Sequence, residues 1–212
     1  MRLPRALGLC LIVAMPMLAG CGSSGGAASA GSVVHPATFP SGKPADIAPK
    51  QAVLRQADVD TTWVVVPQRS GPAGFAEVSK GDPPSLKALE RKSFKGAYET
   101  LFANAQQEVV LSVAASFARP VDAARVARTW AKMVPHGLQH PTRLRTPAGS
   151  PDQFTWWKGT ADVSGSTTPA VVAQWVSGKL VIGLFMVGAS ASPKRLLQFV
   201  QLQNAKILGA AR

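Results

Sequence analysis

The sequence predicts an α+β domain in which an antiparallel sheet of about five strands carries helices on one face. Apolar and small side chains alternate with period two in residues 108–118 and 169–187, which is typical of strands. Residues 121–134 and 193–208 have the composition and apolar spacing of helices. Strand pairs followed by single helices are the element order of this fold class.

The domain is expected to begin near Gln51. The β-branched run at 63–66 predicts a short strand, which Pro67 ends. Residues 68–84 contain three glycines and three prolines and predict a long loop. A helical turn or two is expected from Pro84 onward.

A first hairpin is predicted from strands 94–103 and 108–118, which residues 104–107 join. The second strand should have one apolar face and one face of small side chains. The apolar set is Val109, Leu111, Val113, Ala115 and Phe117, and the other set is Val110, Ser112, Ala114, Ser116 and Ala118. A helix should follow at 121–134, with Pro120 in its first turn and Pro135 at its end.

Residues 136–151 predict a loop, 152–158 a strand and 161–168 a turn. A second hairpin should join 169–176 to 179–187 through Ser177-Gly178. One of its faces is apolar throughout and should be buried: Val171, Ala173, Trp175, Leu180, Ile182, Leu184 and Met186. The other face is mixed, and the last helix should run from Pro193 to about Leu208.

The chain opens with a positively charged start and an apolar run of signal-peptide length at 6–18. The run is too short to span a bilayer, which takes about 20 apolar residues. The four residues that follow its core, Leu18-Ala19-Gly20-Cys21, resemble the lipobox of bacterial lipoproteins. The resemblance implies that Cys21 receives a diacylglyceryl group, that the leader 1–20 is removed and that the new amino end can be acylated.

This interpretation places the mature protein outside the cytoplasm, anchored to a membrane through lipid at Cys21. Removing the leader also removes Cys10, so the mature chain has no partner for an internal disulfide. Residues 21–50 are rich in Gly, Ser, Ala and Pro and predict a flexible tether. About 30 such residues have a root-mean-square span of roughly 27–33 Å. A single domain is expected at 51–212.

The order of the predicted elements also resembles the small PsbP-like α+β lipoproteins. That resemblance concerns element order and implies no functional residues.

The chain is strongly basic. Its formal net charge is +12, and loss of Arg2 and Arg5 with the leader leaves +10. Lys87, Arg91, Lys92 and Lys95 form the densest basic group, but the chain has no long basic run and no basic–aromatic repeat. Nucleic acid is therefore not an expected partner. The alternatives are a solvated basic surface and attraction to an anionic membrane or polymer.

The sequence offers little for catalysis. His136 and His140 have helical metal-site spacing, but neighbouring prolines and a glycine argue against a helix there, so no metal and no cofactor are expected. Asp58 and Asp60 are interpreted as a cap or turn. No nucleophile motif is present, and no catalytic residues are assigned.

The five tryptophans suggest a weak binding-site hypothesis. Trp156 and Trp157 are adjacent in a predicted strand, so their rings should point to opposite faces of the sheet. A face of small side chains is expected to contain Gly183, Ser112, Ala114 and Ser116. Trp157, Gln174 and Gly183 are therefore the candidate ligand-binding residues, unless the 68–84 loop covers that face.

Three functions follow from this reasoning. The first is a lipid-anchored module of the cell envelope that binds an unknown small molecule or protein without catalysis. The second is a basic adaptor for an anionic membrane or envelope polymer, which requires Lys and Arg to gather on one side in space. The third is a hydrolase that uses His136 or His140.

Overall fold

A computed structural model of the protein describes residues 39–40, 42–80 and 82–209. The predicted leader, the lipobox ending at Cys21 and most of the tether at 21–50 lie outside these residues. Among the described helices, none has both the length and the apolar character needed to cross a bilayer.

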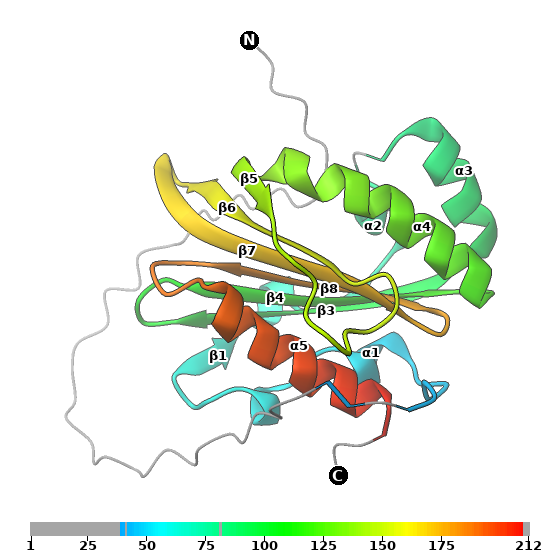
Figure 1. The fold of residues 1–212 in the computed structure, drawn as a ribbon, viewed down its shortest axis with the longest axis horizontal. Coiled ribbons are helices and arrows are strands. Elements are labelled where there is room, and N and C mark those ends of the chain that lie inside the picture. The colour runs from blue at the N-terminus through cyan, green and yellow to red at the C-terminus, as the bar shows by residue number, and fades with distance from the viewer. Residues whose placement is uncertain (1–38, 41, 81, 210–212) are drawn as a thin grey trace.

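The described residues form one antiparallel sheet of eight strands (Figure 1). The strands are β1 (Trp63–Val65), β2 (Gly71–Ala73), β3 (Phe94–Asn104), β4 (Val109–Phe117), β5 (Gln139–Arg143), β6 (Thr155–Val163), β7 (Ser166–Ser177) and β8 (Leu180–Val187). Their spatial order is β1-β3-β4-β8-β7-β6-β5, and β2 also pairs with β3. The predicted antiparallel α+β class is confirmed, but the sheet is larger than the five strands expected.

Two of the additional strands lie in segments that the sequence predicted to be loops. β2 falls within 68–84 and pairs with β3, whereas β5 falls within 136–151 and pairs with β6. Each contains a proline, Pro72 or Pro141, which lacks an amide donor and is tolerated only where a strand has a free edge. A proline-containing edge strand has no sequence pattern that separates it from a loop.

The hairpin of β6 and β7 is longer than predicted. Residues 161–168 were expected to form a turn, but the two strands pair as far as Val163 and Ser166. Only Ser164 and Gly165 form the connection, and both have positive φ angles, 52° and 82°. Such a two-residue turn matches the twist of an antiparallel pair.

The turn between β7 and β8 lies one residue later than predicted. Ser177 pairs with Leu180, so the connecting residues are Gly178 and Lys179. Gly178 has a φ of 58°, which suits a glycine at the first central position of a tight hairpin turn. The shift moves each pairing by two residues, and an even shift keeps every side chain on its predicted face. All seven residues of the predicted buried face are indeed buried.

The helices cover both faces of the sheet, rather than the one face predicted (Figure 1). They are α1 (Pro49–Ala52), α2 (Phe75–Val78), α3 (Pro84–Ser93), α4 (Pro120–Met133) and α5 (Pro193–Ile207), with short 3-10 turns η1 (Gln56–Asp58), η2 (Pro67–Arg69) and η3 (Val134–Gly137). We call the face under α1 and α5 the α5 face and the opposite one the α4 face. Both are covered because the central strands are apolar on both sides.

The α5 face carries the larger core. Trp63, Trp175 and Phe102 are fully buried there beneath α5 and the segment 52–54. The small side chain of Ser112 lets this segment approach closely. Its Oγ accepts a hydrogen bond from the Leu54 amide at 3.0 Å and donates to Gln203 Oε1 at 3.1 Å. The face of small side chains predicted for β4 is therefore a helix-packing face.

The described chain also begins on the α5 face. The ring of Phe39 contacts that of Phe154, with centroids 5.9 Å apart. The Ala45 amide donates to the Ile207 carbonyl at 3.0 Å, near the end of α5. The first described residues therefore lie on the α5 face.

Candidate functional site

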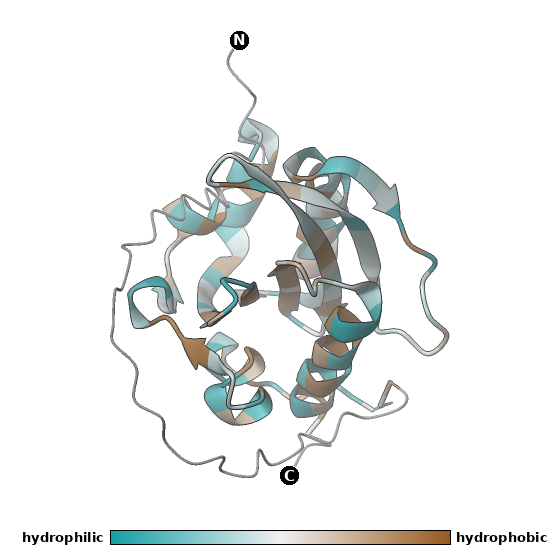
Figure 2. Cartoon of the chain, turned by 90° about the vertical axis from the view of Figure 1, so that its left-hand side faces the viewer, coloured by the Kyte–Doolittle hydropathy of each residue, from teal (hydrophilic) through white to brown (hydrophobic). Residues whose placement is uncertain are grey.

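Basic side chains gather on the packed pair α3 and α4. The period of a helix places the buried residues Ala123, Val126 and Ala127 against the sheet and turns Arg125 and Arg128 outward. The alternating brown and teal along the helices in Figure 2 shows this amphipathic character. The helix pair and the residue before α4 supply seven basic residues, which we call the basic surface: Lys87, Arg91, Lys92, Arg119, Arg125, Arg128 and Lys132.

The basic surface carries no exposed carboxylate on either helix. Glu90 and Asp122 are the acidic residues of α3 and α4, and their exposed fractions are 1% and 3%. Arg119 Nε and Nη2 donate to the two carboxylate oxygens of Asp122, each at 2.9 Å. These hydrogen bonds lower the pKa of Asp122. The surface therefore presents positive charge with little compensation.

A cleft of about 470 Å³ lies where the end of α3 meets the start of α4. Its lining includes Lys92 from α3 and Arg119 and Arg125 from the α4 side, together with Asp122, whose carboxylate is paired with Arg119. The Ala118 amide donates to the Ser93 carbonyl at 2.7 Å and fixes this junction. Neither Lys92 nor Arg125 forms an ion pair with another described residue. Two unpaired cations that converge on a cleft suit an anionic group such as phosphate or carboxylate.

A buried carboxyl pair supports this helix pair from beneath. Trp130 Nε1 of α4 donates to Asp82 Oδ2 at 3.2 Å, and Glu90 of α3 lies beside them. Burial, followed by the charge and hydrogen bond of Asp82, raises the pKa of Glu90 to about 8. Burial also raises the pKa of Asp82. Glu90 is therefore mostly neutral at pH 7 and takes no positive charge away from the basic surface.

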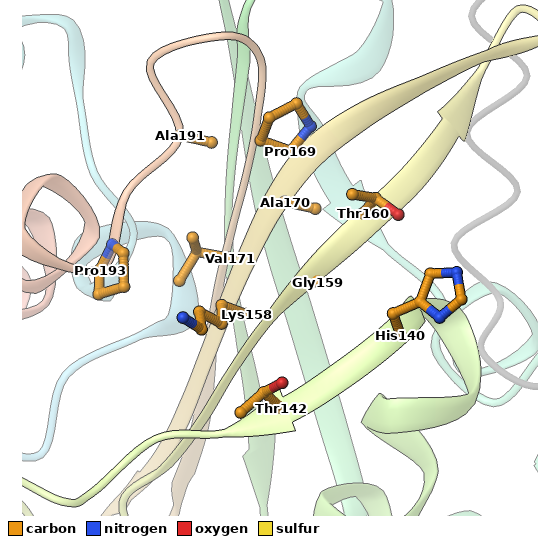
Figure 3. A pocket seen from close by; sticks show the side chains of 10 residues that line it. All are labelled: His140, Thr142, Lys158, Gly159, Thr160, Pro169, Ala170, Val171, Ala191 and Pro193. Atoms are coloured by element: carbon orange, nitrogen blue, oxygen red, sulfur yellow. The ribbon is translucent and has the colours of Figure 1, made fainter.

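A second, shallower groove of about 300 Å³ lies on the α5 face, between the start of α5 and strands β5 to β7 (Figure 3). Its floor is largely apolar and includes Val171 and Pro193. In Figure 3 the side chains of His140 and Lys158 point away from each other. These polar groups do not converge as a nucleophile and a base would need to.

The two histidines of the hydrolase hypothesis are both exposed, His136 in η3 and His140 in β5. No cluster of three or more potential metal-ligating side chains occurs in the described part of the chain. The interpretation of Asp58 and Asp60 as local caps is confirmed. Asp58 accepts from the Arg55 amide at 2.7 Å and also pairs with Lys206, and Asp60 accepts from the Thr62 amide at 3.0 Å.

The three predicted binding residues share the α4 face. The pairings Trp157–Val172 and Gln174–Gly183 place them there. Trp157 and Gln174 are buried beneath α4 and η3, where Gln174 Nε2 donates to the Ala127 carbonyl at 2.7 Å. Gly183 is half-buried, with open space beside its Cα. The helix α4, rather than the 68–84 loop, covers Trp157 and Gln174.

The grouping of Gly183 with the small side chains of β4 was wrong. Gly183 pairs with Val113, whereas Ser112 pairs with Leu184. Directly paired residues point to the same face, so Gly183 and Ser112 lie on opposite faces of the sheet. The prediction failed because the alternation within each strand does not state how two strands are aligned.

The basic surface was not predicted from the sequence, because its two halves are separated by a hairpin. The group at Lys87, Arg91 and Lys92 was recognised, but α4 was considered only as a helix. The spacing of Arg125, Arg128 and Lys132, at three and then four residues, places all three on one helical stripe. That spacing was the available signal.

The fold and the surface together define an α+β domain with helices on both faces and one strongly basic helix pair. No protein-family model matches the chain, and no curated protein sequence matches it. Among solved structures, the chain is similar to the extracellular domain of PknH from Mycobacterium tuberculosis. The two share 12% sequence identity and a TM-score of 0.41, over 78% of this chain and 98% of that one.

Proposed function

We propose that this chain is a lipid-anchored protein of the cell envelope that binds an anionic partner without catalysing a reaction. Cys21 in the lipobox-like sequence is the proposed lipid attachment site, which holds the domain on the outer side of a membrane. The basic surface is the proposed binding site. The main observation in its favour is that α3 and α4 expose most of their basic side chains and bury both of their acidic ones.

The arrangement of charges supports an anionic ligand over an apolar one. Trp157 and Gln174, the residues that an apolar ligand would use, are buried by α4 and engaged in packing. Lys92 and Arg125 instead border an open cleft. Basic residues in the last turn of a helix also stabilise its dipole, which accounts for Arg91 and Lys92 but not for Arg125 and Arg128 near the middle of α4.

The test is to map the binding of triphosphate by nuclear magnetic resonance on the chain from residue 21, with Cys21→Ser. We expect chemical-shift changes to be confined to α3, α4 and the junction around Ser93. The proposal is contradicted if no shifts occur at low salt, or if they spread evenly over all lysines and arginines, Lys50 and Lys194 on the α5 face included.

A further inference from the structure

The basic surface is longer than a single small anion requires. Arg125, Arg128 and Lys132 lie on one stripe of α4 that extends about 10 Å, since a helix rises 1.5 Å per residue. Lys87 and Arg91 add a second stripe of about 6 Å on α3. One phosphate group is fully engaged by two or three cations. A ligand with several anionic groups in a row could engage the remaining cations as well.

The cleft gives this surface a defined starting point. Lys92 and Arg119 border it, and Arg125 both borders the cleft and begins the α4 stripe. One anionic unit in the cleft therefore places the next units along α4. A flat bilayer surface would contact the outermost charges but could not enter a cleft between two helices.

The position of the tether favours the same conclusion. Phe39 packs against Phe154, and the Ala45 amide donates to the Ile207 carbonyl near the end of α5, both on the face opposite to α3 and α4. With the α5 face toward the anchoring membrane, the basic surface points away from it.

We propose that the partner of the basic surface is a polyanionic polymer of the cell envelope, a chain with repeated phosphate or carboxylate groups, which binds from the cleft along α4. This inference rests on the proposed function and specifies its partner. It differs from a membrane-binding role in that the polymer, and not the anchoring bilayer, occupies the surface.

The experiment compares three probes on the chain from residue 21 with Cys21→Ser: triphosphate, long-chain polyphosphate and vesicles containing phosphatidylglycerol. We expect polyphosphate to bind at least about tenfold more tightly per phosphate than triphosphate, and the affinity to fall steeply with salt. Vesicles should bind more weakly than polyphosphate at equal anion concentration.

Two charge-matched variants locate the site. Lys92→Glu with Arg125→Glu should weaken polyphosphate binding about tenfold or more, whereas Lys50→Glu with Lys194→Glu on the α5 face should change it less than about twofold. Both pairs alter the net charge equally, and all four side chains are exposed, so a general charge effect would weaken binding equally in both. Circular dichroism and thermal melting verify that each variant is folded.

Each other outcome overturns the inference in a recognisable way. If triphosphate binds at the basic surface and polyphosphate binds no more tightly per phosphate, the proposed function stands but the partner is not a polymer. Vesicle binding that is lost in the Lys92/Arg125 variant, with polyphosphate unaffected, makes the surface a membrane face. If both double variants weaken polyphosphate binding equally, the basic surface is not a specific site. If no probe binds at all, the proposed function is overturned as well.

Discussion

At the scale of single residues, Glu90 is the most unusual group in the molecule. It is a buried carboxyl at the interface of α3 and α4, next to a second carboxyl, Asp82, that accepts a hydrogen bond from Trp130. Such a pair is stable only while one member holds a proton.

The pH dependence of stability follows from the raised pKa of Glu90. A carboxyl whose pKa is about 8 in the folded protein and 4.5 when unfolded stabilises the fold fully below pH 4.5. That contribution is lost as the pH rises through about 8. Urea unfolding of the unmodified protein should therefore show a free energy of unfolding that falls as the pH rises from about 5 to 8. These limits lie near the pKa values of Glu90 in the unfolded and the folded protein.

The variant Glu90→Gln should remove this loss, because the amide is neutral at every pH. We expect it to be more stable than the unmodified protein at alkaline pH, with the difference shrinking toward acid. Asp152→Asn, at an exposed carboxylate, is the control. Parallel pH profiles for Glu90→Gln and the unmodified protein would contradict the assignment.

Gln174 is assigned a structural rather than a ligand-binding role. Its buried amide satisfies the Ala127 carbonyl of α4 and joins that helix to β7. Gln174→Ala should lower the free energy of unfolding by about 1–3 kcal/mol through the unpaired group and the lost packing. Polyphosphate affinity should remain unchanged in conditions where the variant is folded. A stable variant that has lost binding would instead restore Gln174 as a ligand residue.

At the scale of elements, the two long helices α4 and α5 pack on opposite faces of the sheet. α5 buries Leu196 and Val200 against the large core, while α4 buries Ala123 and Val126. Small residues at the inner positions of α4 allow its backbone to approach the sheet closely. Its long basic side chains are directed outward as a result.

The docking of α5 can be tested by truncating its inner face. Leu196 is fully buried, so Leu196→Ala should reduce the free energy of unfolding by about 2–5 kcal/mol. Val121 on α4 is 51% exposed, and Val121→Ala should change it by no more than about 0.5 kcal/mol. Chemical denaturation of both variants measures the contrast, and similar losses would mean that α5 is not packed as described.

The elements also show what a sequence can predict. The buried face of the β7–β8 hairpin was correctly assigned because strict alternation marks it and survives a register shift of two residues. The strands β2 and β5 were missed because Pro72 and Pro141 are typical of loops. The basic surface was missed in part: the spacing of Arg125, Arg128 and Lys132 indicates a stripe on α4, but the packing of α3 beside that stripe is a long-range property that no local pattern contains.

At the scale of the whole molecule, the described chain begins on the α5 face, and the basic surface lies on the opposite face, where the binding site is proposed. The sequence alone predicts the anchor, since Leu18-Ala19-Gly20-Cys21 lies outside the described residues. The structure adds the position of the tether's attachment and the location of the charges. With the proposed anchor at Cys21, these positions predict that α3 and α4 face away from the membrane.

The anchor itself is tested by mass spectrometry of the native protein. We expect an amino terminus at Cys21 that carries the mass of a diacylglyceryl group, and Cys21→Ser should release the protein from the membrane fraction. A retained leader, or a free thiol at Cys21 in the membrane-bound protein, would contradict the proposed attachment and location.

The central claim is that an anionic chain occupies the cleft between α3 and α4. The most direct measurement is a crystal structure of the mature chain with polyphosphate bound. We expect phosphate density between Lys92 and Arg125 that continues toward Arg128. Density on the α5 face, with an empty cleft, would contradict it.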